Sequence, residues 1–275
     1  VNLIKSNKEL QRYIIAAGSD KLAQTIGSAS VVSTMLFGII VGSMSLSSIL
    51  SAIAMLPSII FAVIGSKIAG KKGSLKVMVD WSKICIVVNI IYAAFILFAP
   101  ASMIGDLMNK KASSVVLGVI IAIVFLLLNF AVNATKMVVS VATNSLRMDI
   151  VDYEFDRTGK YMPAAVSATY SFVDKAISSF GAFIATAMIG LIGYTTTVPQ
   201  QGDPLTVGVK VITVVLLIGF PIIGWICTIL AMKKSNITFE KMEEVQKNIA
   251  YKKSKLPQEN KSEIVEETIT EFTEE

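Results

Sequence analysis

Long apolar runs separated by short polar segments make up most of the chain. A transmembrane helix needs about 20 predominantly apolar residues. Six stretches reach this length, at roughly 10–40, 46–66, 77–98, 114–146, 164–194 and 207–232. Pro57 predicts a kink in the second stretch, because proline removes a backbone donor. The pattern therefore predicts an all-α integral membrane fold, with a six-helix transmembrane bundle over residues 1–232.

Residues 233–275 differ in kind from the apolar runs. Apolar residues recur at helical spacing at Phe239, Met242, Val245 and Ile249, which predicts a short amphipathic helix over 238–253. This helix either lies on the membrane surface or the bundle, or is a solvated helix with no special role. From Leu256 onward, seven glutamates and one lysine predict an acidic, disordered end. The whole segment is expected to be a cytoplasmic tail.

Composition supports the membrane class and excludes several kinds of site. The chain is 53% hydrophobic with a mean hydropathy of +0.67, far too apolar for an ordinary soluble domain. It has no histidine, which removes histidine bases and histidine metal ligands. Its two cysteines, Cys85 and Cys227, both lie in apolar runs, so neither a disulfide framework nor a zinc site is indicated.

Lysine and arginine are distributed unevenly between the two ends of the predicted spans. Nineteen of them fall on the side that holds both termini, the segment 67–83 and the mixed-charge segment 147–160, which we expect to be a loop. Three, Lys110, Lys111 and Lys210, fall on the opposite side. Cytoplasmic segments carry the excess of basic residues in membrane proteins, so both termini are expected in the cytoplasm. Orientation in a bilayer thus accounts for the net charge of +5 without a nucleic-acid partner.

The fourth apolar run carries a stripe of polar residues on one helical face. They are Asn129, Asn133, Lys136, Ser140, Asn144 and Arg147, spaced three or four residues apart. Polar side chains of this kind also join helices within bundles. A lysine about 16 Å from the cytoplasmic end of the run favours a face that lines a cavity, because ionised groups inside a membrane usually mark functional interiors.

Two further runs carry ionisable residues. In the first run, Asp20, Gln24 and Ser28 share one side, with Lys21 beside them. They line a cavity, or they lie at the headgroups if this span begins later. In the fifth run, one helical face carries the small or polar residues Ser167, Ser171, Asp174, Ser178 and Gly181. Lys175 directly follows Asp174. Adjacent helical residues point about 100° apart, so Asp174 and Lys175 each need a partner on another helix or in water. Three interior lysines against two aspartates call for a further carboxylate from elsewhere.

The segment from Arg147 to Gly193 carries a recognisable combination of residues. It contains, in order, Asp152-Tyr153, Thr158-Gly159-Lys160, a helix with Lys175, and Leu191-Ile192-Gly193-Tyr194. This combination resembles the segment that joins the tenth and eleventh helices of the glycoside-pentoside-hexuronide:cation symporters, the melibiose permease-like members of the major facilitator superfamily. The chain departs from the usual family pattern at Glu154, Phe155 and Tyr161.

The resemblance implies one half, the C-terminal six helices, of a major facilitator superfamily bundle. The implied activity is secondary active transport, in which uptake of a sugar or glycoside is coupled to Na⁺, Li⁺ or H⁺ by alternating access at the cell membrane. The resemblance places Lys175 near the sugar and cation sites, whereas a role for Asp174 is inferred from its own position. The N-terminal six-helix half is absent from this chain, which begins with Val1 rather than methionine, so we expect a fragment.

Two other classes of function stay open. One is transport of a different solute, a lipid or an anion, on the same fold, because sugar sites usually contain aromatic platforms and neither Trp81 nor Trp225 sits on the polar faces. The other is a membrane-embedded enzyme or a structural subunit. Without histidine, a hydrolase needs a pair such as Ser171 and Lys175, spaced i, i+4. No cofactor is expected in any of these cases.

The predicted orientation has a direct test. A cysteine introduced by Lys110→Cys should react with a membrane-impermeant thiol reagent added from outside intact cells, because the basic bias places this position outside. Labelling from the cytoplasmic side alone would reverse the topology.

Overall fold

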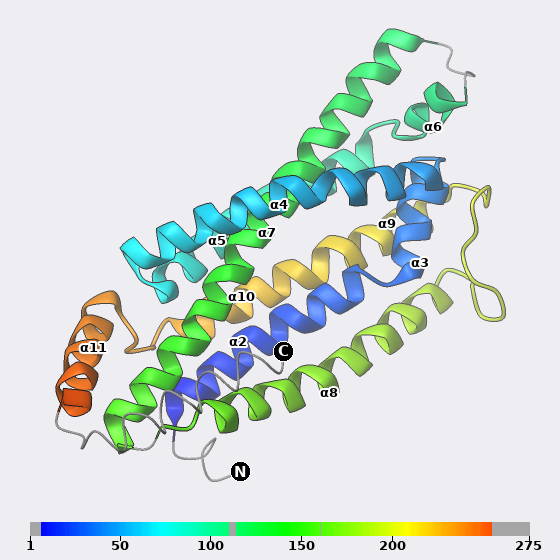
Figure 1. Ribbon diagram of the computed structural model, residues 1–275. Coiled ribbons are helices and arrows are strands. Elements are labelled where there is room, and N and C mark those ends of the chain that lie inside the picture. Colours follow the sequence, from blue (N-terminus) through cyan, green and yellow to red (C-terminus); the bar gives the residue numbers. More distant parts are fainter. Residues whose placement is uncertain (1–6, 110–113, 160, 255–275) are drawn as a thin grey trace.

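A computed structural model describes residues 7–109, 114–159 and 161–254. Every regular element in this part of the chain is helical (Figure 1). In chain order the elements are α2 (Lys8–Gly27), α3 (Ser30–Ser33), the π-helix η1 (Thr34–Ile40), α4 (Met44–Lys72), α5 (Ser74–Phe98), α6 (Ser102–Met108), α7 (Val115–Thr158), α8 (Pro163–Gly190), α9 (Val207–Val214), the π-helix η2 (Val215–Gly219), α10 (Phe220–Met232) and α11 (Phe239–Ser254).

The predicted all-α membrane class is confirmed. Among the described residues, four helical stretches are long and apolar enough to cross a membrane, and two bent pairs raise the number to six. In the first pair, α2 meets the α3–η1 segment at 54°. In the second, α4 bends by 45° between Ile53 and Ser58, in the part of the sequence that contains Pro57.

The first span is therefore broken rather than continuous over 10–40. The α2 helix ends at Gly27, and the backbone N–H of Ser28 still bonds to the carbonyl of Gln24. Ala29 then takes φ −59° and ψ 140°, outside the helical region, before α3 begins. Glycine is a weak helix former, and Gly27 lies beside the backbone of Leu216 and Leu217 in η2. The break lies directly beside the polar residues of α2.

The last span is continuous, but its middle is a π-helix. The η2 segment, Val215–Gly219, comes immediately before α10, whose second residue is Pro221. Proline supplies no N–H to the helical ladder and crowds the preceding turn. A π-type insertion is one of the local adjustments that relieve such a site, and such insertions are frequent at functional sites.

The expectation of a loop over 147–160 is wrong. The α7 helix continues to Thr158, and only Gly159, with φ 72°, ends it. Charged residues of this segment have partners: Glu154 is buried and paired with Arg157 at 2.8 Å, and Asp152 and Asp156 contact α11. Ile150, Val151 and Phe155 are buried. The many charged residues suggested a loop. The segment can nevertheless continue the helix, because no glycine or proline interrupts it before Gly159.

The α2 helix occupies the middle of the arrangement. It packs against α10 on one side and α8 on another, whereas α7 packs against α4 and α5 (Figure 1). The α8 helix contacts mainly α2, and its other face leaves Phe172, Phe180 and Phe183 more than 60% exposed. Side chains of this kind need lipid or another helical surface to cover them.

Beyond α8, the chain makes a compact connection to α9. The Tyr194 hydroxyl donates to Oδ2 of Asp203 at 2.8 Å, and the same oxygen accepts from the backbone N–H of Gln200 at 2.9 Å. Burial and the Asp203 carboxylate raise the pKa of Tyr194 to about 12. This phenol therefore stays protonated and keeps donating at physiological pH.

The tail helix α11 is docked against the C-terminal end of α7, which agrees with the alternative that this helix lies against the bundle. Val245 and Ile249 are buried against Phe155. Polar contacts frame this core: Gln246 Nε2 donates to Oδ2 of Asp152 at 2.6 Å, and Lys252 Nζ lies 2.8 Å from Oδ1 of Asp156. The predicted acidic end, residues 255–275, lies outside the described residues.

The docked position of α11 predicts a specific cross-link. In a background without Cys85 and Cys227, the pair Asp152→Cys and Gln246→Cys should form a disulfide readily, because the two side chains touch. The control pair is Asp152→Cys with Glu244→Cys, whose side chain points to solvent. Equal oxidation rates for the two pairs, measured by gel mobility, would mean that α11 is not held in this register.

Candidate functional site

A polar layer crosses the bundle between two apolar clusters. One cluster contains the residues of α2 from Leu10 to Ala17 and those of α7 from Val138 to Val151. The other contains Ile26 of α2 and the α7 residues from Ile121 to Val132. Asp20 and Gln24 of α2 and Asn133 and Lys136 of α7 lie in the interval between the clusters. Because apolar packing closes the structure on both sides, this layer is where a polar solute can be held inside the membrane.

A cavity of about 450 Å³ lies in this layer, between α2, α4, α7, η2 and α10. It is lined by Asp20, Gln24, Ser28, Ser58, Asn133, Lys136, Ser140 and Trp225, together with smaller and apolar residues. Asp20 lies 12 residues after the start of α2, or about 18 Å along its axis, close to the middle of a hydrocarbon core about 30 Å thick. Six of the residues singled out from the sequence thus line one mid-membrane cavity: Asp20, Gln24, Ser28, Asn133, Lys136 and Ser140.

Asp20 is the acidic group of the cavity. It is 8% exposed, and its Oδ2 accepts a hydrogen bond from Gln24 Nε2 at 2.7 Å. Trp225 also interacts with this carboxylate, and Lys136 and Lys21 lie near enough to act on it electrostatically. A buried carboxylate with one close donor retains acceptor capacity for a further partner.

Lys136 is the basic group of the cavity. Its Nζ lies 6.0 Å from the centre of the Trp225 ring, within reach of a cation–π interaction. Among the described residues its charge is balanced at a distance by Asp20 rather than by an ion pair in direct contact. The cavity therefore contains the ammonium of Lys136 as a donor and the carboxylate of Asp20 as an acceptor. The indole of Trp225 forms one of its walls.

Asn129 lies one turn outside this cavity. Its Nδ2 donates to the Tyr92 hydroxyl at 2.9 Å and to the Phe125 carbonyl at 3.2 Å, and it lines a smaller adjoining hollow together with Asn133 and Lys136. Asn133 in turn donates to the Asn129 carbonyl at 2.8 Å. Asn129 therefore combines the two roles considered from the sequence: it joins two helices, and it lines the smaller hollow.

The adjacent charged residues of α8, Asp174 and Lys175, have different surroundings. Asp174 forms an ion pair with Lys21 of α2, with Nζ and Oδ2 3.4 Å apart. Lys175 lies on the exposed face of α8, outside the set of residues that line the Asp20–Lys136 cavity. The structure thus groups Asp20 with Lys136 on one side of α2, and Lys21 with Asp174 on the other.

The motif residues of α7 serve the tail rather than the cavity. Asp152 holds Gln246 of α11, and Tyr153 packs beside the small apolar core between α7 and α11. The Thr158 hydroxyl donates to the Glu154 carbonyl at 2.8 Å, and Gly159 ends the helix in the left-handed region. Lys160 lies outside the described residues.

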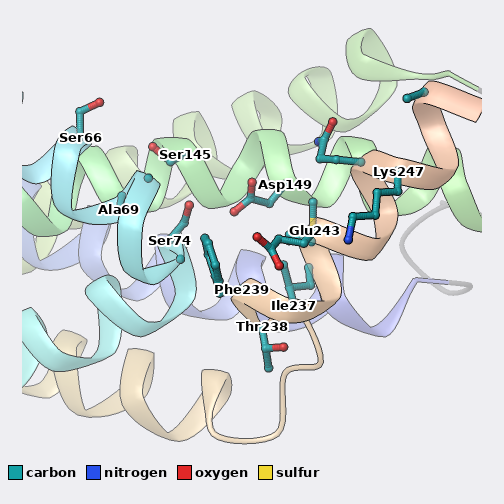
Figure 2. A pocket seen from close by; sticks show the side chains of 15 residues that line it. Ser66, Ala69, Ser74, Ser145, Asp149, Ile237, Thr238, Phe239, Glu243 and Lys247 are labelled. Atoms are coloured by element: carbon teal, nitrogen blue, oxygen red, sulfur yellow. The ribbon is translucent and has the colours of Figure 1, made fainter. Parts of the chain in front are cut away.

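A second cavity of about 650 Å³ lies between the α4–α5 turn, the C-terminal part of α7 and α11. Figure 2 shows Asp149 of α7 and Glu243 of α11 at this cavity, near Ser74 and Phe239. It is lined in part by Ala69 and Ile237 of the first apolar cluster and lies outside the polar layer. The smaller, mid-membrane cavity is therefore the candidate solute site.

Trp225 and Ser58 are the cavity residues that sequence reasoning missed. Trp225 was not assigned to a polar face, because its span contains few polar residues. The pattern that could have identified it is the four-residue spacing of Leu217, Pro221 and Trp225. This spacing places the three residues on one face of the last span, and all three line the cavity. Ser58 gave no periodic signal, since its position depends on the bend in α4.

Comparison with known proteins agrees with this architecture. A family model described as MFS/sugar transport protein matches residues 4–238, which includes all the transmembrane helices and the polar layer. No curated protein and no solved structure matches the chain significantly. By the extent of the family match, this chain is a multi-pass membrane transporter that belongs to the MFS/sugar transport family.

Proposed function

We propose that this chain forms the C-terminal half of a secondary active transporter that couples uptake of a sugar or glycoside to Na⁺, Li⁺ or H⁺. The observation that carries the proposal is the cavity in the polar layer, where Asp20, Lys136, Asn133 and Gln24 meet beside Trp225. Sugar hydroxyls both donate and accept hydrogen bonds. A carboxylate, an ammonium and two amides supply the complementary acceptors and donors.

The cavity also suits alternating access. It is bordered by the break after Gly27, by the η2 segment and by the bend in α4. Irregular helices near the membrane midplane are typical of transporter binding sites, where halves of the protein rock about a fixed solute. The other half would be an N-terminal six-helix bundle, which also covers the exposed phenylalanines of α8. We further propose that the transporter lies in the cell membrane with both termini in the cytoplasm, which the distribution of basic residues supports. The sequence resemblance over Arg147 to Gly193 supports a place among the melibiose permease-like symporters.

A second candidate function is transport of an anionic solute on the same fold. Lys136 favours it, because its ammonium faces the cavity without a carboxylate in direct contact among the described residues. A solute with a carboxylate or phosphate group would complete that pair. An embedded hydrolase is disfavoured, because Ser171 and Lys175 lie on the exposed face of α8 and a nucleophile with its base requires a pocket.

The proposal predicts that Asp20→Asn and Lys136→Gln weaken solute binding. A hydrogen bond to a charged partner contributes about 1.5–3 kcal/mol, so each change should raise the dissociation constant roughly tenfold to a hundredfold. The measurement is equilibrium binding to membrane vesicles that contain the complete transporter, with a panel of radiolabelled neutral glycosides and anionic solutes. Lys241→Gln, on α11, is the matched control.

The outcome of this panel separates the candidates. Binding of neutral glycosides that depends on both residues supports the sugar transporter. Binding of anions alone, lost in Lys136→Gln and kept in Asp20→Asn, favours the second candidate. Unchanged binding in both variants would mean that the cavity is not the solute site.

The family resemblance yields a further prediction for Lys175. This residue lies about 18 Å along α8 from its first residue, near the middle of the membrane, where an ammonium cannot easily reach the headgroups. Lys175→Gln should abolish ion-driven uptake at normal expression, whereas Lys110→Gln should not. Normal accumulation by Lys175→Gln would assign this lysine to packing or to the interface with the other half.

A further inference from the structure

We propose that the outer surface of α5 and α10 binds an anionic phospholipid, with its phosphate at lysines near one end of the two helices and its acyl chains along their exposed apolar residues. We call this surface the α5–α10 face. Its exposed apolar residues are Ile84, Val87, Ile90, Ile91 and Phe98 of α5 and Ile223, Ile226 and Leu230 of α10, and its lysines are Lys76, Lys233 and Lys234. The inference goes beyond the proposed function, because it depends on no solute and no coupling ion.

The exposed positions of α5 change from charged to apolar along the helix. Lys76, Asp80 and Lys83 come first, and Ile84 begins a series of exposed apolar positions that continues to Phe98. These positions recur every three or four residues, so they share one face. A phospholipid has the same order, a charged headgroup followed by hydrocarbon. The border between Lys83 and Ile84 therefore marks the depth at which headgroups meet acyl chains.

The α10 helix shows the same change at the same end of the bundle. Ile223, Ile226 and Leu230 are exposed, and the exposed Lys233 and Lys234 directly follow the helix. The two helices contact each other. The turn before α5 lies against the start of α11, shortly after α10 ends (Figure 1). The basic ends of α5 and α10 are therefore neighbours.

The α5–α10 face points away from the solute cavity. Among the described residues, α5 contributes none to the lining of that cavity. The α10 helix contributes Pro221 and Trp225, whereas helical geometry places Ile223, Ile226 and Leu230 on its other side. The other half of the transporter has to meet the cavity, so it covers a different surface of this chain. Lipid is left to cover the α5–α10 face.

Positive charge is in excess at the basic end of the face. In residues 7–109, 114–159 and 161–254, the exposed lysines here that form no ion pair are Lys67, Lys71 and Lys72 of α4, and Lys76, Lys233 and Lys234. Two acidic residues of this region are engaged with lysines. Asp80 pairs with Lys83 at 3.1 Å, and Glu240 lies near enough to Lys76 to interact electrostatically. The remaining lysines attract a phosphodiester group.

Orientation of the chain in the membrane does not account for this arrangement. The basic bias across a membrane depends on how many lysines lie on each side, not on the helix face that they follow. Here lysines stand at the ends of two exposed apolar stripes. The stem of a lysine can lie on apolar surface while its ammonium stays among the headgroups. A zwitterionic lipid fits this surface less well, because its own cation offsets its phosphate.

The test is lipid binding to the complete transporter, purified and freed of lipid in detergent. Native mass spectrometry measures the affinity of the tightest-bound dioleoylphosphatidylglycerol and of dioleoylphosphatidylcholine. Each lysine near an anionic lipid contributes about fivefold in affinity. Lys76→Gln should therefore weaken binding of the anionic lipid about fivefold, and Lys233→Gln combined with Lys234→Gln roughly 25-fold. Binding of the zwitterionic lipid should stay unchanged in all of them, which also shows that the variants are folded.

The matched control removes two lysines at the same end of the molecule but on α11. Lys241 is paired with Glu244, and Lys247 lines the 650 Å³ cavity. Lys241→Gln combined with Lys247→Gln should retain wild-type affinity for the anionic lipid. Lys233→Arg combined with Lys234→Arg should retain it as well, because the charge is kept. If the double glutamine variant at 233 and 234 fails to fold, Lys76→Gln and the arginine variant decide the question.

Three results would overturn the proposal. Equal affinity of the wild type for the two lipids rejects the site. An equal loss in the α11 control and in the variant at 233 and 234 shows a general attraction of charge, which rejects it too. Displacement of the anionic lipid by inorganic phosphate at the same concentration assigns the lysines to a soluble anion. None of these results concerns the solute cavity, so the proposed transport is tested separately.

Discussion

Ionised groups inside a membrane bundle must find their partners within the protein, and this constraint orders the structure. Water is not available to solvate Asp20, Lys136, Lys21 or Asp174 from the lipid side, and an unpaired charge there is unfavourable by several kcal/mol. The chain meets this constraint by gathering polar residues into one layer. Apolar clusters on both sides of the layer supply the packing that holds the helices in place. The cavity and the ion pair thus depend on the same separation of polar from apolar surface.

The α2 helix carries two kinds of interaction on two of its sides. The direction of a side chain changes by about 100° from one residue to the next, so Asp20 faces α7 and α10 while Lys21 faces α8. Glycines at the contact with α8, Gly18 and Gly181, let the two helices approach closely. Helical periodicity alone therefore gives two adjacent residues different partners.

Much of the fold was predictable, because the length of apolar runs is set by membrane thickness. The six predicted spans correspond to the four clear membrane helices and the two bent pairs. Breaks were harder to predict than spans. The non-helical backbone at Ala29, which follows the end of α2, has no signal in the apolar pattern, and the π-helix before α10 depends on how its neighbours accommodate the missing donor of Pro221. The segment 147–158 was misread for a different reason, since its charges were counted without regard to the apolar residues between them.

The site was predictable where residues share one helix face. Asn133, Lys136 and Ser140 point into one cavity because they lie three or four residues apart, and the same holds for Asp20 and Gln24. Contacts between helices have no such local signal. The pairing of Lys21 with Asp174 and the position of Trp225 arise only when separate spans are packed together.

The unbroken length of α7 has a mechanical consequence. At about 1.5 Å per residue, its 44 residues extend roughly 66 Å, about twice the thickness of the hydrocarbon core. Phe155, where α11 is docked, lies about 28 Å along the axis from Lys136. The helix thus works as a lever. A tilt of a few degrees about the mid-membrane cavity displaces the tail helix by a few ångströms, so the position of α11 is sensitive to small movements at the centre of the bundle.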